Sequence, residues 1–332
     1  MPASSSRSRA MVRVTRPFIV GLTTLAVAVS LMACGGSASP TAATPTGSTT
    51  PATGAGDALC GLSYSAFNGS AKVQANSVYS WTCTSTVRTV AGNGIPDHVV
   101  NTGNFATPIS VQNIVVNFTL SPTSTGGVSG PVMNPGYAIN SVKLDPGTAG
   151  TCTSTATGTA PGAGCVAANG QDPWRLEALG GAFAFGTDES NAHVQPNGQY
   201  HYHGMPEGII NKLNKGQAMT LVAFAIDGFP IYARYGYTDA TSATSPIKVM
   251  RGSWQKKSTP DAGRPSVATF PMGTFTQDYL YVAGSGELDE CNGRTGVTPE
   301  YPNGTYHYYI TDTYPYIQRC MKGRLGPVSA AR

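Results

Sequence analysis

The chain has 332 residues, of which only 11% are charged, and its formal net charge at pH 7 is +4. Four of the 21 basic residues are arginines within the first 16 positions, so the remaining 17 balance the 17 acidic residues. A neutral chain without a cluster of lysine or arginine lacks the positive surface with which proteins bind nucleic acid. Nucleic acid is therefore excluded as a partner.

Residues 1–33 have the pattern of a lipoprotein signal peptide. An arginine-rich start precedes an apolar run from Phe18 to Met32, which ends at Cys34 in a sequence resembling a bacterial lipobox. The alternative, a transmembrane anchor, fits less well because the run is shorter than the ~20 residues of a spanning helix. Cleavage elsewhere by the ordinary signal peptidase is a further outcome. We expect lipidation of Cys34 and a membrane-anchored protein facing the periplasm or the cell exterior.

The segment after the leader has a composition that cannot form a core. Residues 34–56 are mostly Gly, Ser, Thr, Ala and Pro, with almost no large apolar side chains. Such a segment buries too little apolar surface to fold, so it is predicted to be a flexible tether that follows the lipidated cysteine. The tether would hold the rest of the chain away from the membrane surface.

Residues 57–325 are predicted to form a single large, mostly β domain, sandwich-like or barrel-like, with long loops. Short apolar runs rich in β-branched and aromatic residues alternate with turn residues throughout this region. Helical periodicity is scarce, and short helical turns are expected only at 174–179 and 208–213. The clearest predicted strands cover 110–120, 219–226, 279–282 and 305–310.

Six cysteines follow Cys34, and an even number in an exported protein indicates disulfides. Six cysteines allow 15 pairings, among which the sequence alone does not choose. No CxxC pair occurs, which argues against a zinc ribbon or a thioredoxin-type redox site. We expect disulfides that staple the loops, and proximity along the chain favours Cys60–Cys83, Cys152–Cys165 and Cys291–Cys320.

The run Tyr200-His201-Tyr202-His203 is the main candidate for a functional site. The alternation of Tyr and His favours a strand, and the Asn-Gly pair just before it is a turn signal. Residues two apart on a strand point to the same side, so His201 and His203 should share one face and the tyrosines the other. Two such imidazoles can bind one metal ion at ~2.0–2.1 Å.

The run returns in altered form at 306–309, as Tyr-His-Tyr-Tyr, again after Asn-Gly. His307 would supply a third ligand if the two strands are neighbours. His193 lies shortly before His201, and a hairpin through 196–198 would bring it back to the same place, as a ligand or as the partner of a ligand. The predicted metal ligands are therefore His201, His203, His307 and His193.

Five further residues are candidates for contacts around this site. His98 lies in a turn-rich loop, and Asp289 lies in an acidic one. Asp227 follows an apolar strand and enters a Gly-Phe-Pro turn, so an Asx turn is the simpler interpretation. The alternative is a carboxylate that orients a ligand histidine. The tyrosines Tyr200 and Tyr202 complete this set.

Copper is favoured over zinc as the bound ion, because imidazole ligands, aromatic surroundings and an exported location suit it. Whether the ion would be catalytic, and so whether the protein is an enzyme, stays open. A second hypothesis is a metal-free enzyme that uses Tyr and His as acid and base on carbohydrate, with Arg234 or Arg294 neutralising a substrate carboxylate. A third is a glycan-binding or adhesion module whose tyrosines stack on sugar.

Six segments, taken in order, resemble the YHYH-domain family, a group of secreted or lipid-anchored proteins. The resemblance covers roughly residues 85–323 and implies no particular activity. It implies that all five histidines and Asp227 lie in family motifs, which favours a shared site. The segments are NGIPDH (93–98), WRLEAL (174–179), NAHVQPNGQYHYHG (191–204), DGFPIY (227–232), LDECNGR (288–294) and NGTYHYYITDTYP (303–315).

Overall fold

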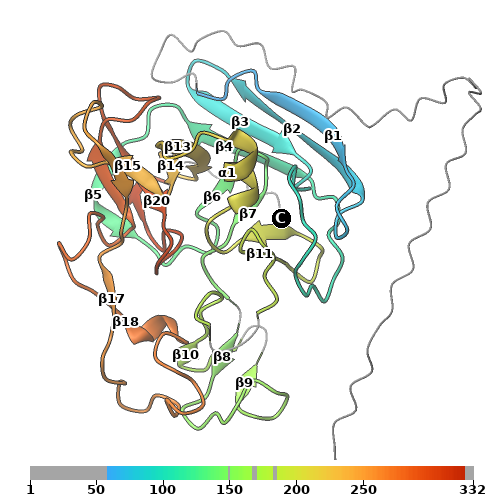
Figure 1. The fold of residues 1–332 in the computed structure, drawn as a ribbon, viewed down its shortest axis with the longest axis vertical. Coiled ribbons are helices and arrows are strands. Elements are labelled where there is room, and N and C mark those ends of the chain that lie inside the picture. Colours follow the sequence, from blue (N-terminus) through green and yellow to red (C-terminus); the bar gives the residue numbers. More distant parts are fainter. Residues whose placement is uncertain (1–57, 149, 167–169, 182–184, 326–332) are drawn as a thin grey trace, which may run out of the picture. The chain divides into compact units, whose positions relative to one another are not determined.

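A computed structural model describes residues 58–148, 150–166, 170–181 and 185–325 (Figure 1). The predicted leader, Cys34 and the tether lie outside these residues. The described part of the chain is mostly β, as predicted, with many short strands and one short α-helix. No helix within these ranges is long and apolar enough to cross a membrane.

A four-stranded antiparallel sheet forms the first part of the domain and appears in blue and cyan in Figure 1. Buried and exposed residues alternate along its second and fourth strands, so only one face of the sheet is covered. This is the pattern of a half-buried strand, in which successive side chains point to opposite faces. In sheet order the strands are β1 (Ser63–Asn68), β2 (Ala75–Cys83), β3 (Val87–Gly92) and β4 (Ile114–Thr119).

An eight-stranded sheet forms the centre of the domain. Its neighbours are antiparallel except for two parallel pairs, β12 with β7 and β14 with β20. Four strands lie between β12 and β20, which carry the two Tyr-His-Tyr runs. In sheet order the strands are β11 (Ala192–Val194), β12 (Tyr200–Tyr202), β7 (Lys143–Leu144), β6 (Gly136–Ala138), β13 (Thr220–Ala225), β14 (Pro230–Ala233), β20 (Thr305–Ile310) and β19 (Gly293–Gly296).

The covered face of the four-stranded sheet packs on the eight-stranded sheet, so the predicted sandwich-like arrangement is confirmed. Trp81 of β2 is fully buried between the two sheets. Its ring lies 5.8 Å from that of Phe224 on β13, and its indole N–H donates to the carbonyl of Ile139 at 2.7 Å. Burial of such large rings supplies most of the hydrophobic stabilisation at this interface.

The remaining elements are short and lie outside these two sheets. The helical turn predicted at 208–213 is confirmed by α1 (Glu207–Leu213). The one predicted at 174–179 is wrong, because Trp174 and Arg175 pair with residues 151–152 as a strand. The other elements are β5 (Ser124–Ser129), β8 (Thr151–Cys152), β9 (Cys165–Val166), β10 (Trp174–Arg175), β15 (Tyr235–Tyr237), β16 (Ile247–Val249), β17 (Trp254–Lys256), η1 (Thr276–Asp278), β18 (Tyr279–Tyr281) and β21 (Met321–Gly323).

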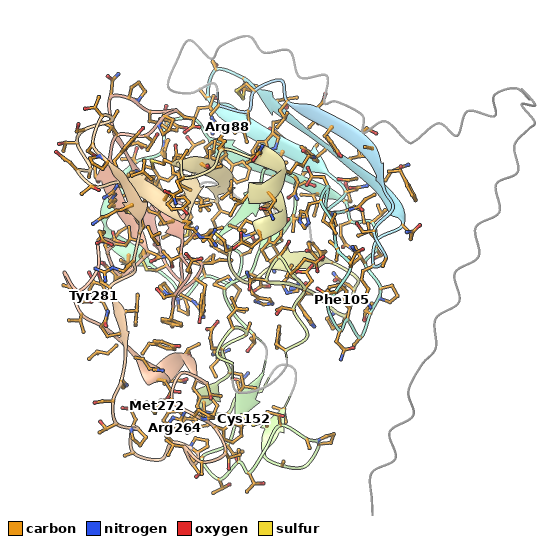
Figure 2. All side chains as sticks on the ribbon, in the orientation of Figure 1. Arg88, Phe105, Cys152, Arg264, Met272 and Tyr281 are labelled. Carbon is orange, nitrogen blue, oxygen red and sulfur yellow. A yellow bond between two sulfur atoms is a disulfide. The ribbon has the colours of Figure 1, made fainter. Side chains whose placement is uncertain are left out.

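A buried ion pair organises the loop that precedes η1. The side chain of Arg264, labelled in Figure 2, is fully buried and lies over the ring of Phe275. Its Nε and Nη2 donate to the two carboxylate oxygens of Asp278 at 2.6 and 2.8 Å. The same carboxylate accepts the backbone N–H groups of Gly273 and Phe275. One acid therefore satisfies four buried donors.

Three disulfides form, with the pairing that proximity along the chain favours. Two of them close loops near strand ends, and the third ties the acidic turn before β19 to the segment before β21. The pairs are Cys60–Cys83, Cys152–Cys165 and Cys291–Cys320.

Candidate metal centre

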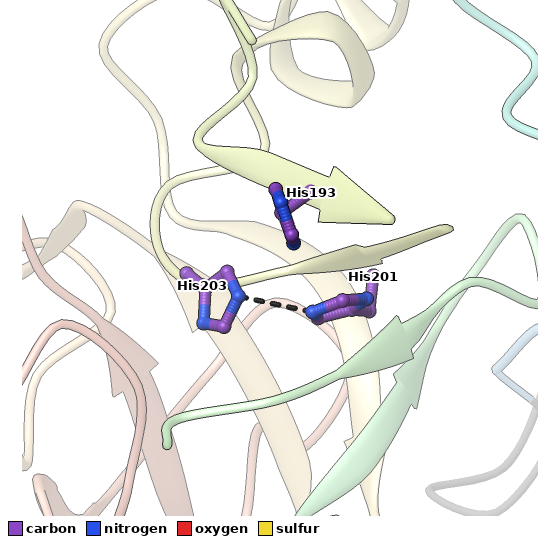
Figure 3. Close-up of side chains that lie close together, drawn as sticks. All are labelled: His193, His201 and His203. Carbon is purple, nitrogen blue, oxygen red and sulfur yellow. Dashed lines mark hydrogen bonds between the residues drawn. The ribbon is translucent and has the colours of Figure 1, made fainter. Parts of the chain in front are cut away.

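The predicted hairpin between His193 and His201 is confirmed. Strands β11 and β12 pair antiparallel with His193 directly opposite His201 (Figure 3). The turn uses Asn197, whose side-chain oxygen accepts the N–H of Gln199 at 3.1 Å, and Gly198, whose φ of 83° suits glycine. Side chains of directly opposite residues lie on the same face of a sheet, so the hairpin itself brings the two imidazoles together.

The three histidines His193, His201 and His203 form a cluster on one face of this hairpin. One ring nitrogen of each lies within 4.8 Å of the others. The Nε2 atoms of His201 and His203 are 2.9 Å apart, as drawn in Figure 3. Two nitrogens bound to one ion in tetrahedral geometry would lie about 3.3 Å apart. Small side-chain rotations would therefore suffice to bring the three nitrogens around an ion.

The proton positions follow from the hydrogen bonds. Nδ1 of His201 lies 3.0 Å from the carbonyl of Gln199 and must donate to it, because a carbonyl only accepts. Nε2 of His201 is then an acceptor and receives the Nε2–H of His203. Nδ1 of His203 is buried and makes no hydrogen bond of normal geometry, although the backbone of Asp145 lies near enough to raise its pKa slightly.

Burial keeps these imidazoles neutral. Desolvation lowers the pKa of His201 to about 4, and the nearby carboxylate of Asp145 opposes that shift only in part. Desolvation also lowers the pKa of His203 well below its ordinary value and that of the half-buried His193 below it. The ring of Phe185 lies 5.1 Å from that of His203, edge to face, on the apolar side. A neutral imidazole is the form that binds metal.

Asp145 is the acidic group beside the cluster, and the sequence pattern does not single it out. It lies in a Leu-Asp-Pro-Gly stretch that has the composition of a turn. Its carboxylate accepts from the ammonium of Lys143 at 2.8 Å and from the side-chain amide of Gln195 at 3.0 Å. The parallel pairing of β7 with β12 places Lys143 opposite His201. Only this non-local pairing reveals that Asp145 belongs here.

The tyrosines of the motif point away from the cluster, as the strand pattern predicts. Tyr200 donates to the carboxylate of Asp188 at 2.5 Å. The hydroxyl of Tyr202 lies 2.7 Å from Nε2 of His98 and 3.0 Å from the side-chain nitrogen of Asn140. Both tyrosines are completely buried. They and His98 therefore hold the back of β12 and do not contact a ligand on the histidine face.

His307 does not join the cluster, which corrects the expectation that it is a third ligand. Its strand, β20, is five positions from β12 in the sheet, about 24 Å along it at the usual strand spacing. His307 is fully buried, with Nδ1 3.0 Å from the carbonyl of Thr305 and Nε2 3.0 Å from the hydroxyl of Tyr309. Both ring nitrogens thus have protein partners. The third histidine of the cluster is His193 instead.

The two acidic candidates also belong to the second motif and not to the cluster. Asp227 accepts the N–H of Phe229 at 3.3 Å, as expected for an Asx turn, and the hydroxyl of Tyr308 at 2.6 Å. Asp289 accepts the hydroxyl of Tyr306 at 3.0 Å. Burial raises the pKa of both carboxyls above the ordinary range. Their role is to fix the turns and tyrosines around β20.

His307 should make the fold sensitive to acid. Burial lowers its pKa to about 4, against 6.5 for an exposed histidine. Between these values the unfolded chain binds a proton that the folded chain does not, so stability falls as the pH drops from 6.5 towards 4. In His307→Gln, the loss of unfolding free energy between pH 7 and 4.5 should be smaller by on the order of 2 kcal/mol. Urea unfolding at both pH values measures this; equal losses in the two proteins would contradict it.

Comparison with known families gives one match. A family model described as YHYH protein matches residues 115–323, which include all of β4 but its first residue and every later strand. Both Tyr-His-Tyr runs, the histidine cluster and the Cys291–Cys320 disulfide lie within this range. No curated protein and no solved structure matches the chain. The chain belongs to the YHYH protein family.

Proposed function

We propose that this protein binds one transition-metal ion through His193, His201 and His203. The observation that carries the proposal is the convergence of three neutral imidazoles, with one nitrogen of each within 4.8 Å of the others. Within the cluster a hydrogen bond joins His201 and His203, and the buried Nδ1 of His203 has no hydrogen-bond partner among the described residues. Burying polar groups that are only partly satisfied costs stability, and such groups are commonly ligand sites.

A metal ion would satisfy the cluster better than the hydrogen bond does. If the Nε2 atoms of His201 and His203 bind the ion, the proton of His203 moves to Nδ1, beside the backbone of Asp145. Nδ1 of His201 already donates to a carbonyl, the usual arrangement that orients a ligand histidine. Imidazole sites bind Cu²⁺ more tightly than the other divalent first-row ions, so copper is the first candidate and zinc the second.

Three protein ligands leave a coordination position open, which is the arrangement of catalytic sites. His193 is the least buried of the three and lies on the exposed side of the cluster. A small molecule would reach the ion from there. The acid–base and glycan-binding hypotheses have no comparable support among the described residues, because the motif tyrosines are buried and hydrogen-bonded within the protein.

The proposed location is outside the cytoplasm, attached to a membrane through lipid on Cys34. The support is the leader pattern of residues 1–33 and the three disulfides, which form and persist in oxidising compartments. Labelling with a radioactive fatty acid would test the anchor. Label that persists in Cys34→Ser would contradict it.

Elemental analysis of the exported protein tests the metal site. We expect about one copper or zinc per chain, bound on purification or after incubation with the ion and dialysis. The double variant His201→Ala/His203→Ala should remain folded and lose the metal. The matched control is His307→Gln, which alters a histidine in the other Tyr-His-Tyr run and should keep it. A wild-type protein that takes up neither ion would overturn the proposal.

A further inference from the structure

The eight-stranded sheet consists of two halves with the same plan. In each half a short hairpin is followed, after a long connection, by a second hairpin whose last strand pairs parallel with the first hairpin. The halves are β6, β7, β11, β12 and β13, β14, β19, β20. They meet at the β6–β13 pair, where Tyr137 lies opposite Phe224. An approximate two-fold axis through that pair therefore relates the strand order of one half to that of the other.

The register of pairing is the same in both halves. His193 lies opposite His201 in the first half, and Arg294 lies opposite His307 in the second. On the other side of the motif strand, Leu144 pairs with Tyr202 and Ile231 pairs with Tyr308. These pairs fix a residue-by-residue correspondence. It equates the run 200–203 with the run 306–309.

The turn before each second hairpin is also the same. Asp188 accepts the N–H groups two and four residues later and the hydroxyl of Tyr200. Asp289 accepts the N–H groups two and four residues later and the hydroxyl of Tyr306. A left-handed asparagine follows three residues after each aspartate, Asn191 with φ 54° and Asn292 with φ 60°.

Two further contacts repeat. The side chain of Asn140 bonds to the hydroxyl of Tyr202, and that of Asp227 bonds to the hydroxyl of Tyr308. Nδ1 of His201 and Nδ1 of His307 each lie 3.0 Å from the carbonyl two residues earlier. Agreement in strand order, register, backbone conformation and side-chain contacts at matching positions is more than two similar tetrapeptides require.

We infer that the sheet is an internal duplication and that its second half carries a closed counterpart of the histidine cluster. There Arg294 and Tyr309 stand at the positions of His193 and His203, around His307. His193 and Arg294 are both partly exposed, and His203 and Tyr309 are both buried. Nη2 of Arg294 lies 3.4 Å from the hydroxyl of Tyr309, which contacts Nε2 of His307 at 3.0 Å.

The counterpart thus contains the guanidinium of Arg294, a permanent cation of the protein itself. A guanidinium stays charged at every physiological pH and donates hydrogen bonds but accepts none, so it cannot be a metal ligand. The duplication then explains why a second histidine motif exists without a second cluster. It also predicts that residues of one half can take the matching positions of the other half.

An exchange of residues between the halves tests the equivalence without any metal. The variant His193→Arg/His203→Tyr gives the first half the residues of the second. The control His193→Tyr/His203→Arg has the same composition in the wrong order and buries an unpaired guanidinium. We expect the exchange variant to melt within about 3 °C of the metal-free wild type and the control about 10 °C lower or more. Equal melting temperatures of the two variants would overturn the inference.

The reverse exchange tests the site. In Arg294→His/Tyr309→His the second half has three histidines, and we expect it to bind one more copper or zinc ion than the wild type. This arm rests on the proposed function. A wild type that binds one ion and a folded variant that also binds one would refute the closed counterpart alone. If neither binds metal, the proposed function fails, and the melting temperatures of the exchange pair still decide the duplication.

Discussion

Replacing His201 by alanine is expected to lower the affinity for Cu²⁺ or Zn²⁺ by about 100-fold or more. Loss of even an indirect partner of a metal ligand costs about 10–100-fold, and His201 is proposed to contact the ion itself. Its Nε2 points at the centre of the cluster, while Nδ1 is held by the carbonyl of Gln199. His193→Ala should weaken binding as well, since His193 lies directly opposite on β11.

Competitive titration against a chelator of known affinity, at fixed pH, measures these changes. His307→Gln and His98→Gln are the controls, because each alters a buried histidine that hydrogen-bonds to a tyrosine away from the cluster. Both should bind metal as the wild type does. If His98→Gln lost as much affinity as His201→Ala, the ligand set assigned to the cluster would be wrong.

Replacing Asp278 by alanine is expected to lower the free energy of unfolding by about 3–5 kcal/mol. The substitution leaves the fully buried guanidinium of Arg264 without its counter-charge, and removing one partner of a buried ion pair costs about that much. It also removes the acceptor of two backbone N–H groups in the loop before η1. Urea unfolding followed by tryptophan fluorescence measures the loss.

The double variant Arg264→Met/Asp278→Leu separates charge from packing. Replacing both partners of a buried pair by apolar residues of similar volume is often close to neutral. We therefore expect it to be more stable than Asp278→Ala, with its remaining loss due to the two N–H groups that Asp278 accepts and the two carbonyls to which Arg264 donates. A double variant less stable than Asp278→Ala would show that Arg264 stabilises the loop even without its counter-charge, through its hydrogen bonds to the carbonyls of Pro265 and Pro271.

The sequence predicts the local part of the site well. The alternation in the run 200–203 places His201 and His203 on one face, because the side-chain period of a strand is two. The Asn-Gly turn returns the chain after His193, so the hairpin brings that histidine into the cluster. Both inferences need only short-range geometry, and both are confirmed by the register of β11 and β12. The three disulfides are likewise pairs of nearby cysteines.

The non-local part could not be predicted in the same way. Two similar motifs suggest neighbouring strands, but an approximate two-fold arrangement places β12 and β20 symmetrically about the β6–β13 pair and hence apart. The sequence pattern does not reveal Asp145 for a related reason. Its Pro-Gly context indicates a turn, whereas its position beside the histidines depends on the parallel pairing of β7 with β12. Strand order is decided by the whole sheet and not by any single segment.

Both faces of strand β12 are ordered before any ion binds, and this affects how fast an ion would bind. Tyr200 and Tyr202 fix its back through hydrogen bonds to Asp188, Asn140 and His98, while the histidine face is already assembled. Sites that order only when the metal arrives couple binding to folding of the chain. This one requires small rotations of side chains and a shift of the His203 proton from Nε2 to Nδ1. Uptake should therefore follow simple second-order kinetics, with a rate set by dehydration of the ion and not by a conformational step.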